Sequence, residues 1–409
     1  MRKTFLLAML CACCYLAKAQ TSQTEHAFSA YSTAMNNKLS EASQRKDLKQ
    51  LLTLINEWLE AYDKEPASVQ KNFKSYLPNM YYNLACYQAF ENQGELAINS
   101  FQKAVDAGYV NYAHALKDSD LDGLKANKQF IAALQQMRLK GDYRYILKTA
   151  GDYRTKAYPT TLSAFTYQKA SATALVNFRN KFNLDSIAGK GDEISKIKNL
   201  LYWVHNLIRH DGNSSNPKSK NAIDLIEVCQ KENRGVNCRM LATVLKDAYL
   251  AMGFESRAIT CMPKDTADFD CHVINIVWSK SLNKWLWMDP TNNAFVSDDK
   301  GNLLSIEEVR ERLINDRPLV LNENANWNNK QKQTKEQYLD HYMSKNLYWL
   351  QCTVKSEWDL ETQEEGKPIV EYINLYPGAY STIGNQAKEQ TKSLTMYATG
   401  NAAYFWKKP

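Results

Sequence analysis

The stretch GVNCRMLATVLKDAYLAMGFESRAI (residues 235–259) decides the fold of the second half of the chain. Its apolar residues recur at helical spacing, at Leu241, Val244, Leu245, Ala248 and Met252. Asn237 is a favourable N-cap residue, and Gly253 is typical of a helix C-terminus. The pattern predicts an amphipathic helix that begins at Cys238 and is followed at once by a strand.

Cys238 would lie at the N-terminus of this helix. There the positive end of the helix dipole and unpaired backbone N–H groups favour the thiolate, which is the reactive form of cysteine. A buried cysteine can also be simply a small apolar core residue. The position of Cys238 alone leaves both interpretations open.

A second stretch, DCHVINIVWSKSLNKWLWMDPTNN (residues 270–293), has two apolar runs around a polar SKSLN and predicts a β-hairpin. A turn centred on residues 280–281 pairs His272 with Asp289. The same register pairs two sets of apolar residues, Ile274 with Trp287 and Ile276 with Trp285. Directly paired side chains have Cβ atoms about 4.5–5.5 Å apart, within reach of a hydrogen bond. A slip of one residue would turn one of the partners to the opposite face.

Cys238, His272 and Asp289 are the residue types that nucleophilic catalysis requires. His272 would accept the thiol proton and later protonate the leaving group. Asp289 would orient the imidazole and stabilise its protonated form. We therefore predict these three residues as the catalytic group of a cysteine enzyme, although an isolated histidine would be interpreted as structural.

Three ordered blocks, GVNCRMLATVLKDAYLAMGFESRAI, CHVINIV and KWLWMDPT, resemble the core of transglutaminase-like proteins, which have a papain-like fold. In that family a Cys opens the central helix, a His opens the next strand and an Asp ends the following one. Those places correspond here to Cys238, His272 and Asp289. The upstream WVHNLIRH resembles the preceding helix, with Trp203 at its aromatic position. The resemblance covers about residues 190–295.

The sequence departs from the family pattern at two positions. His210 stands where many members have Tyr, and Ile274 where many have Trp. The backbone N–H of Cys238 can serve as one oxyanion donor. The second donor is not identifiable from the sequence, with Gln230 and Trp203 as the candidates.

The resemblance implies attack of the Cys238 thiolate on an amide or peptide carbonyl, through a thioester acyl-enzyme. It favours an exported peptidase or amidase over a cross-linking enzyme, with a protein or peptide substrate and no cofactor. The alternative is a catalytically weak or inactive module that binds a peptide or a cell-envelope partner.

The cysteines outside the N-terminal segment are Cys86, Cys229, Cys238, Cys261, Cys271 and Cys352. Because these six cysteines form no CxxC motif and the histidines are scattered, we expect no metal site. Cys261 and Cys271 bracket a loop, and we predict a disulfide between them that would brace His272. Cys86, among apolar helix residues, is expected in a core.

Residues 1–19 have a basic end, an apolar run and an A-x-A cleavage site, which predicts a signal peptide and export. A lipid on Cys13 is the alternative, although Cys11 fits that motif poorly. The apolar run is too short to span a bilayer, and we expect no integral membrane segment after cleavage. Cleavage lowers the formal net charge from +7 to +4, which is too mild to suggest a nucleic-acid or membrane-surface partner.

The remaining patterns predict an α+β protein in three parts. Residues 20–150 are expected to be all-α and resemble a tetratricopeptide repeat, with Gly94 in the inter-helix turn. The repeat's contact positions hold Leu84, Ala85, Ala97, Phe101 and Ala104. This region is a packing module or, alternatively, binds a protein partner. Residues 151–329 would form the catalytic core, a central helix packed on an antiparallel sheet. Residues 330–409 would form a β-rich extension, with strands in LYWLQCTV, IVEYINLY, SLTMYAT and AAYFW.

Overall fold

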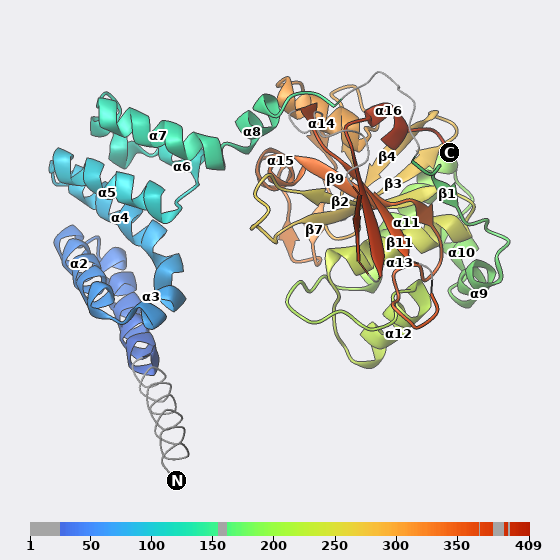
Figure 1. Cartoon of the computed structure of the whole chain (residues 1–409), viewed down its shortest axis with the longest axis horizontal. Coiled ribbons are helices and arrows are strands. Elements are labelled where there is room, and N and C mark those ends of the chain that lie inside the picture. Colours follow the sequence, from blue (N-terminus) through green and yellow to red (C-terminus); the bar gives the residue numbers. More distant parts are fainter. Residues whose placement is uncertain (1–24, 154–161, 368, 379–387, 392) are drawn as a thin grey trace, which may run out of the picture. The chain divides into compact units, whose positions relative to one another are not determined.

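The computed structural model describes residues 25–153, 162–367, 369–378, 388–391 and 393–409. The expected signal peptide and Cys13 lie outside these residues. The chain divides into two compact units, Met1–Asp142 and Tyr143–Pro409, both drawn in Figure 1. Within the described residues, none of the helices combines the length and the apolar character needed to cross a membrane.

The N-terminal unit is helical, as predicted. Residues 25–44 form a helix. The elements that follow are α2 (Leu48–Lys64), α3 (Ala67–Phe73), η1 (Lys74–Tyr76), α4 (Leu77–Phe90), α5 (Gly94–Ala107), α6 (Tyr112–Lys117), η2 (Ser119–Leu124) and α7 (Lys128–Gly141). The five predicted repeat contacts are all buried. Four of them lie in the cluster that joins α4 and α5, whereas Leu84 packs in the cluster that contains α2. Gly94, however, opens α5 rather than lying in the turn, where Asn92 adopts the left-handed conformation with φ of 61°.

A seven-stranded sheet forms the centre of the C-terminal unit. Its order is β12-β13-β11-β9-β2-β3-β4. The strands are β2 (Ser256–Met262), β3 (His272–Ser279), β4 (Lys284–Met288), β9 (Trp349–Thr353), β11 (Val370–Leu375), β12 (Lys388–Gln390) and β13 (Leu394–Thr399). Neighbouring strands are antiparallel except for the parallel pair β11–β13. This confirms a predominantly antiparallel sheet, against which the predicted central helix α13 (Cys238–Ala251) packs at β2 and β3.

Helices cover both faces of β3. One hydrophobic cluster joins Val277 of β3 to α13 and to α9 (Thr173–Lys181), α10 (Leu184–Ala188), α11 (Glu193–Leu207) and α12 (Ala222–Lys231). The other cluster joins Ile274 and Ile276 to α8 (Tyr143–Thr149), α14 (Ile306–Ile314), the π-helix η3 (Glu336–Met343) and α16 (Ala402–Phe405). Figure 1 shows α11, α12 and α13 on one side of the sheet and α14 and α16 on the other. Because alternate residues of a strand face opposite sides, every residue of β3 is buried.

Short paired strands complete the unit. They are β1 (Thr166–Tyr167) with β10 (Lys355–Ser356), β5 (Val296–Ser297) with β6 (Val320–Leu321), and β7 (Asn326–Trp327) with β8 (Gln331–Lys332). The one-turn helix α15 (Ser344–Asn346) follows η3 directly.

The described part of residues 330–409 does not form a sheet of its own. Three of the predicted strands are present as β9, β11 and β13, and they belong to the same sheet as β2, β3 and β4. The fourth expectation is wrong, because AAYFW forms the helix α16. The Asn401 side chain caps this helix by accepting a hydrogen bond from the backbone N–H of Tyr404 at 3.0 Å. Contacts divide the chain at residues 142–143, and residues 330–409 share the sheet of the core.

The predicted hairpin is present as β3 and β4, but its register differs by two residues. Ile276 pairs with Trp287 and Ser279 pairs with Lys284, which leaves a four-residue turn. The carboxylate of Glu193 on α11 stabilises this longer turn by accepting hydrogen bonds from the backbone N–H groups of Lys280 and Ser281. A shift of two keeps every side chain on its face, because the strand repeat is two residues.

Arg257 of β2 ties the C-terminal helix to the sheet. It is 1% exposed and donates a hydrogen bond to the carbonyl of Phe405 at 2.9 Å. Its guanidinium also lies 4.1 Å from the ring centre of Phe165 and 4.9 Å from that of Trp285. A buried cation enclosed by aromatic rings gains from each of them.

Replacing Arg257 with Ala should therefore destabilise the C-terminal unit by about 2–4 kcal/mol, since it removes the aromatic contacts and leaves a cavity. Urea unfolding of the full chain measures this. The matched control is Arg179→Ala, whose guanidinium pairs with Asp185 at the surface and should cost less than about 1 kcal/mol. Equal losses in the two variants would contradict this role of Arg257.

Candidate active site

Cys238 is the first residue of α13, as predicted. The Asn237 side chain caps the helix by accepting a hydrogen bond from the backbone N–H of Met240 at 3.2 Å. At the other end Gly253 has φ of 81°, a left-handed conformation that favours glycine. Cys238 is partly exposed. The capping pattern thus places a thiol, with access to solvent, at the positive end of a helix.

The segment before Cys238 lies against a second segment that carries His210. His210 and Val236 form an isolated parallel bridge, in which Val236 donates to the Arg209 carbonyl and Asp211 donates to the Val236 carbonyl. A Cβ atom at position 235 would lie 2.6 Å from the Arg209 carbonyl oxygen. Gly235 is therefore required for the close approach of the two segments.

His272 and Asp289 are directly hydrogen-bonded, although they are not paired residues of the hairpin. Their side chains meet diagonally, because the register differs by two from the expected one. The His272 Nε2 atom lies 2.7 Å from an Asp289 carboxylate oxygen, and both side chains are buried. This contact leaves Nδ1 of His272 as the ring nitrogen available to Cys238.

The carboxylate of Asp289 is fully buried and accepts five hydrogen bonds. Besides His272, the donors are the backbone N–H groups of Thr291 and Asn292, the Asn292 side chain, and the Tyr338 hydroxyl at 2.6 Å. Burial raises the pKa of Asp289, but the charge of His272 and these hydrogen bonds outweigh it and lower the pKa overall. The group is therefore held as a carboxylate.

The thiol of Cys238 and the imidazole of His272 shift in opposite directions. Burial raises the pKa of Cys238, but hydrogen bonds from His210 and His272 and the charge of His272 lower it to about 6. Burial lowers the pKa of His272, but the charge and hydrogen bond of Asp289 and contact with Cys238 raise it to about 10. Between these values the thiolate–imidazolium pair is the favoured state.

The contact between His210 and Cys238 was not predicted from the sequence. His210 stands where many family members have Tyr, but the sequence pattern gives no sign that it hydrogen-bonds Cys238. The two residues named as candidates for a second oxyanion donor, Trp203 and Gln230, have other surroundings. Trp203 packs by ring contacts against Phe178 and Phe182, and Gln230 is an exposed residue of α12.

The π-helix η3 brings two tyrosines to the histidine–aspartate pair. The Tyr338 hydroxyl binds Asp289, and the ring of Tyr342 contacts that of His272 edge-on at a centroid distance of 5.3 Å. π-Helical turns are rare and occur often at functional sites. The sequence pattern assigned this segment to a β-rich extension, so its part in the site was not predicted.

The predicted disulfide between Cys261 and Cys271 is wrong. Both are free thiols among the described residues. Cys261 pairs with His272 across β2 and β3, so Cys271, one residue earlier, points to the opposite face. Cys261 is fully buried in the core, whereas Cys271 is partly exposed.

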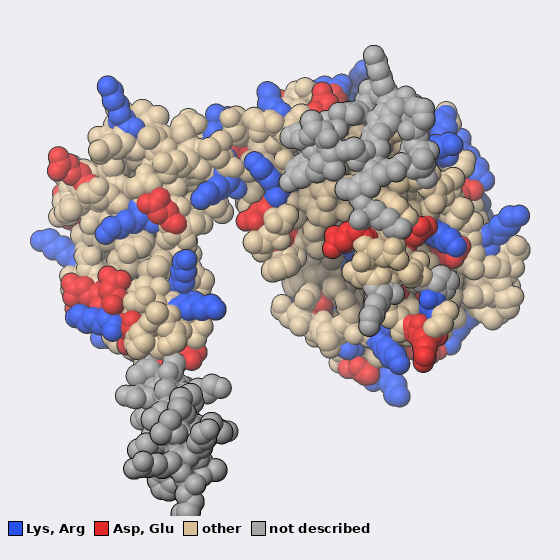
Figure 2. All heavy atoms as spheres, in the orientation of Figure 1, with Lys and Arg blue, Asp and Glu red and all other residues tan. Residues whose placement is uncertain are grey.

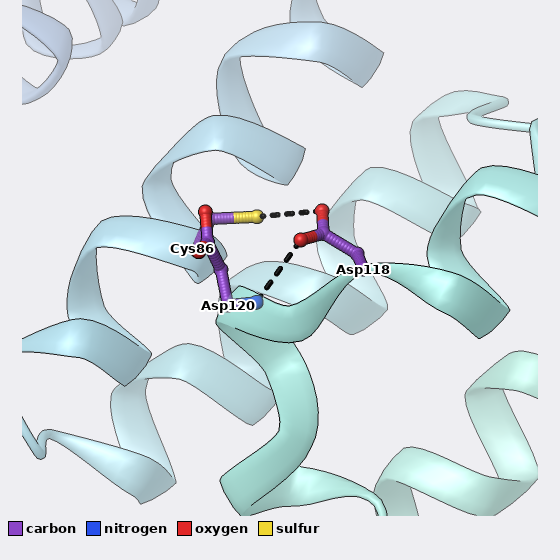
Figure 3. A group of neighbouring side chains, drawn as sticks. All are labelled: Cys86, Asp118 and Asp120. Carbon is purple, nitrogen blue, oxygen red and sulfur yellow. Dashed lines mark hydrogen bonds between the residues drawn. The ribbon is translucent and has the colours of Figure 1, made fainter.

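A second cluster of polar side chains lies in the N-terminal unit, where Cys86, Asp118 and Asp120 can bring ligand atoms within 4.8 Å of one another (Figure 3). Asp118 caps η2 by accepting from the backbone N–H of Asp120, and it also accepts from Cys86 and from the Tyr82 hydroxyl. Burial and the two neighbouring carboxylates raise the pKa of Cys86. A protonated thiol that donates to a helix-capping carboxylate accounts for this cluster.

Comparison with known proteins agrees with the resemblance found in the sequence. Residues 180–290 match the family model of the transglutaminase-like superfamily. The chain thus contains a transglutaminase-like domain, which belongs to a class of cysteine enzymes. A crystal structure from Cytophaga hutchinsonii, of a protein provisionally named a cysteine protease, is similar over 36% of this chain and 46% of that chain. The identity is 16% and the TM-score is 0.24, so this likeness carries no argument. No curated protein matches the sequence.

The Tyr338 hydrogen bond gives a direct test of the Asp289 environment. Tyr338→Phe removes one donor from the buried carboxylate and should cost about 1–3 kcal/mol of unfolding free energy in urea. Tyr342→Phe in the same helix is the control, because its hydroxyl lies 3.5 Å from the oxygen of Asp270 near the surface. We expect this second change to cost less than about 0.5 kcal/mol. A larger loss in Tyr342→Phe than in Tyr338→Phe would refute this assignment.

Proposed function

We propose that the protein is an exported cysteine enzyme that acts on amide or peptide carbonyls through a thioester acyl-enzyme. The observation that supports this most is the meeting of three residues from separate elements. Cys238 begins α13, His272 begins β3, and Asp289 directly follows β4. The opposite pKa shifts of Cys238 and His272 favour the charged pair that such chemistry uses.

In the proposed reaction the Cys238 thiolate attacks the carbonyl carbon, a carbon–sulfur bond forms, and negative charge moves to the carbonyl oxygen. The backbone N–H of Cys238 at the helix N-terminus stabilises that charge. The His272 imidazolium then protonates the departing nitrogen as the carbon–nitrogen bond breaks. This leaves a thioester on Cys238 and a neutral imidazole on His272.

The thioester is resolved by an incoming nucleophile. Water attacks while His272 accepts one of its protons, and the carbon–sulfur bond breaks to give the thiolate and a carboxylic acid, which releases its own proton to solvent. An amine in place of water would give a cross-linked product by the same steps. We favour hydrolysis, so the enzyme would be a peptidase or amidase with a protein or peptide substrate. Its export rests on the signal-like residues 1–19.

The surface is compatible with a peptide substrate of mixed character. On the face drawn in Figure 2, acidic and basic side chains are interspersed over both units. Because both signs of charge occur together on the drawn side of each unit, we do not expect that side to attract one class of charged substrate over long range.

Trapping of the acyl-enzyme tests the proposed chemistry. The mature chain, residues 20–409, would be incubated with a pool of peptides and peptide amides, quenched in acid and examined by mass spectrometry. We expect a thioester adduct on Cys238 and hydrolysed peptide in the unmodified protein, and neither in Cys238→Ala. Cys86→Ala, which removes a thiol of the other unit, is the control and should retain the adduct. Turnover that survives in Cys238→Ala would contradict the proposal.

The pH dependence of the reaction follows from the two shifted groups. Cys238 must lose its proton, so kcat/KM should rise as the pH passes about 6. His272 must keep its proton for the leaving group, so kcat/KM should fall as the pH passes about 10. The expected profile is a bell between these values. A single rise centred above pH 8, near the ordinary thiol pKa of about 8.5, would count against an activated cysteine.

A further inference from the structure

We propose that His210 is a second catalytic imidazole, which donates a hydrogen bond from Nε2 to the Cys238 sulfur and holds it as the thiolate before attack. This inference rests on the proposed function, because it assigns a further role at the same nucleophile. Nothing in the sequence pattern assigns a role to His210, and the resemblance places a tyrosine at its position in many members.

The tautomer of His210 is set by Trp327. The indole N–H of Trp327, in β7, donates to Nδ1 of His210 at 3.1 Å. An indole N–H can only donate, so Nδ1 must be the accepting, unprotonated nitrogen of the ring. The proton of the neutral imidazole is therefore on Nε2, the nitrogen that remains to donate the hydrogen bond by which His210 lowers the pKa of Cys238.

The backbone on both sides of His210 is also held in place. The side chain of Asn328 accepts from the His210 backbone N–H at 2.6 Å and donates to the His210 carbonyl at 2.9 Å. On its other side His210 bridges Val236, two residues before Cys238. The backbone of His210 is thus fixed beside the short segment that carries the nucleophile, with Gly235 allowing the approach.

This geometry gives the two imidazoles different tasks. His272 bonds Asp289 through Nε2 and keeps Nδ1 for proton transfer with Cys238. His210 has its Nδ1 occupied by Trp327, so it has no free acceptor nitrogen and cannot take the thiol proton. It can only donate. Donation to a charged sulfur stabilises the thiolate relative to the thiol.

Other groups near the sulfur must stay constant in a test of His210. Those that interact electrostatically with Cys238 are His272, Arg239 of the same helix, Cys261, Cys271 and Tyr342 of η3. The substitutions of His210 and Trp327 described below change none of them.

The test is the rate of Cys238 alkylation by iodoacetamide between pH 4 and 10, quantified by peptide mapping of the mature chain. His210→Phe keeps a planar ring and removes the donor. We expect the apparent pKa of Cys238 to rise by about one unit, so that labelling at a pH below both midpoints slows about tenfold. His210→Gln, which retains a side-chain N–H, should keep most of the original rate.

Trp327→Phe provides a variant in which His210 itself is untouched. It removes the indole donor, so the His210 proton is free to move to Nδ1. We expect the midpoint of Cys238 labelling to rise in the same direction as in His210→Phe, but by less. If His210 only braced the fold, these variants would change thermal stability without moving the labelling midpoint.

His272→Ala separates this inference from the proposed function. A midpoint that rises in His272→Ala but not in His210→Phe or Trp327→Phe would overturn the role of His210 and leave the cysteine enzyme standing. A midpoint near the ordinary thiol value in the unmodified protein, unaffected by any of the variants, would overturn both. A rise in His210→Phe that His210→Gln does not relieve would overturn the donor role and leave only steric placement.

Discussion

The hydrogen bond between His272 and the fully buried Asp289 is the constraint on which this domain depends. A carboxylate taken out of water is costly unless several donors surround it. Here those donors come from the turn after β4, from β3 and from η3, so that three regions must be in place together. The polar groups of the site therefore also hold the fold together. Because Tyr338 is one of the donors, residues after 330 are part of that arrangement.

The helix with its cysteine was the part most readily predicted from the sequence. Its apolar spacing, its N-cap residue and its terminal glycine are local signals within one segment. The structure confirms the cap at Asn237, the start of the helix at Cys238 and the left-handed glycine at Gly253. The hairpin was predicted correctly, but the predicted pairing of its two strands is out of register by two residues. Turn length is decided here by Glu193, a residue some ninety positions away, whose carboxylate accepts from the turn.

The features that escaped prediction all depend on contacts between distant segments. Trp327 sets the tautomer of His210 from more than a hundred residues away, and Tyr338 reaches Asp289 from a π-helix that lies in a region predicted as β. The spacing of apolar residues along the sequence carries no information about such contacts. The disulfide failed for a simpler reason, since the strand repeat turns Cys261 and Cys271 to opposite faces. The two-residue repeat of a strand is a general rule, but applying it to these cysteines requires the register of β2 and β3, which could not be read from the sequence.

The central claim is that Cys238 is a thiolate paired with protonated His272 near neutral pH. Ultraviolet titration of thiolate absorbance in the mature chain, taken as a difference from Cys238→Ser, measures it without any substrate or reagent. We expect the absorbance of one thiolate to appear with a midpoint near pH 6. A difference spectrum that appears only above pH 8, as for an ordinary thiol with a pKa of about 8.5, would contradict it.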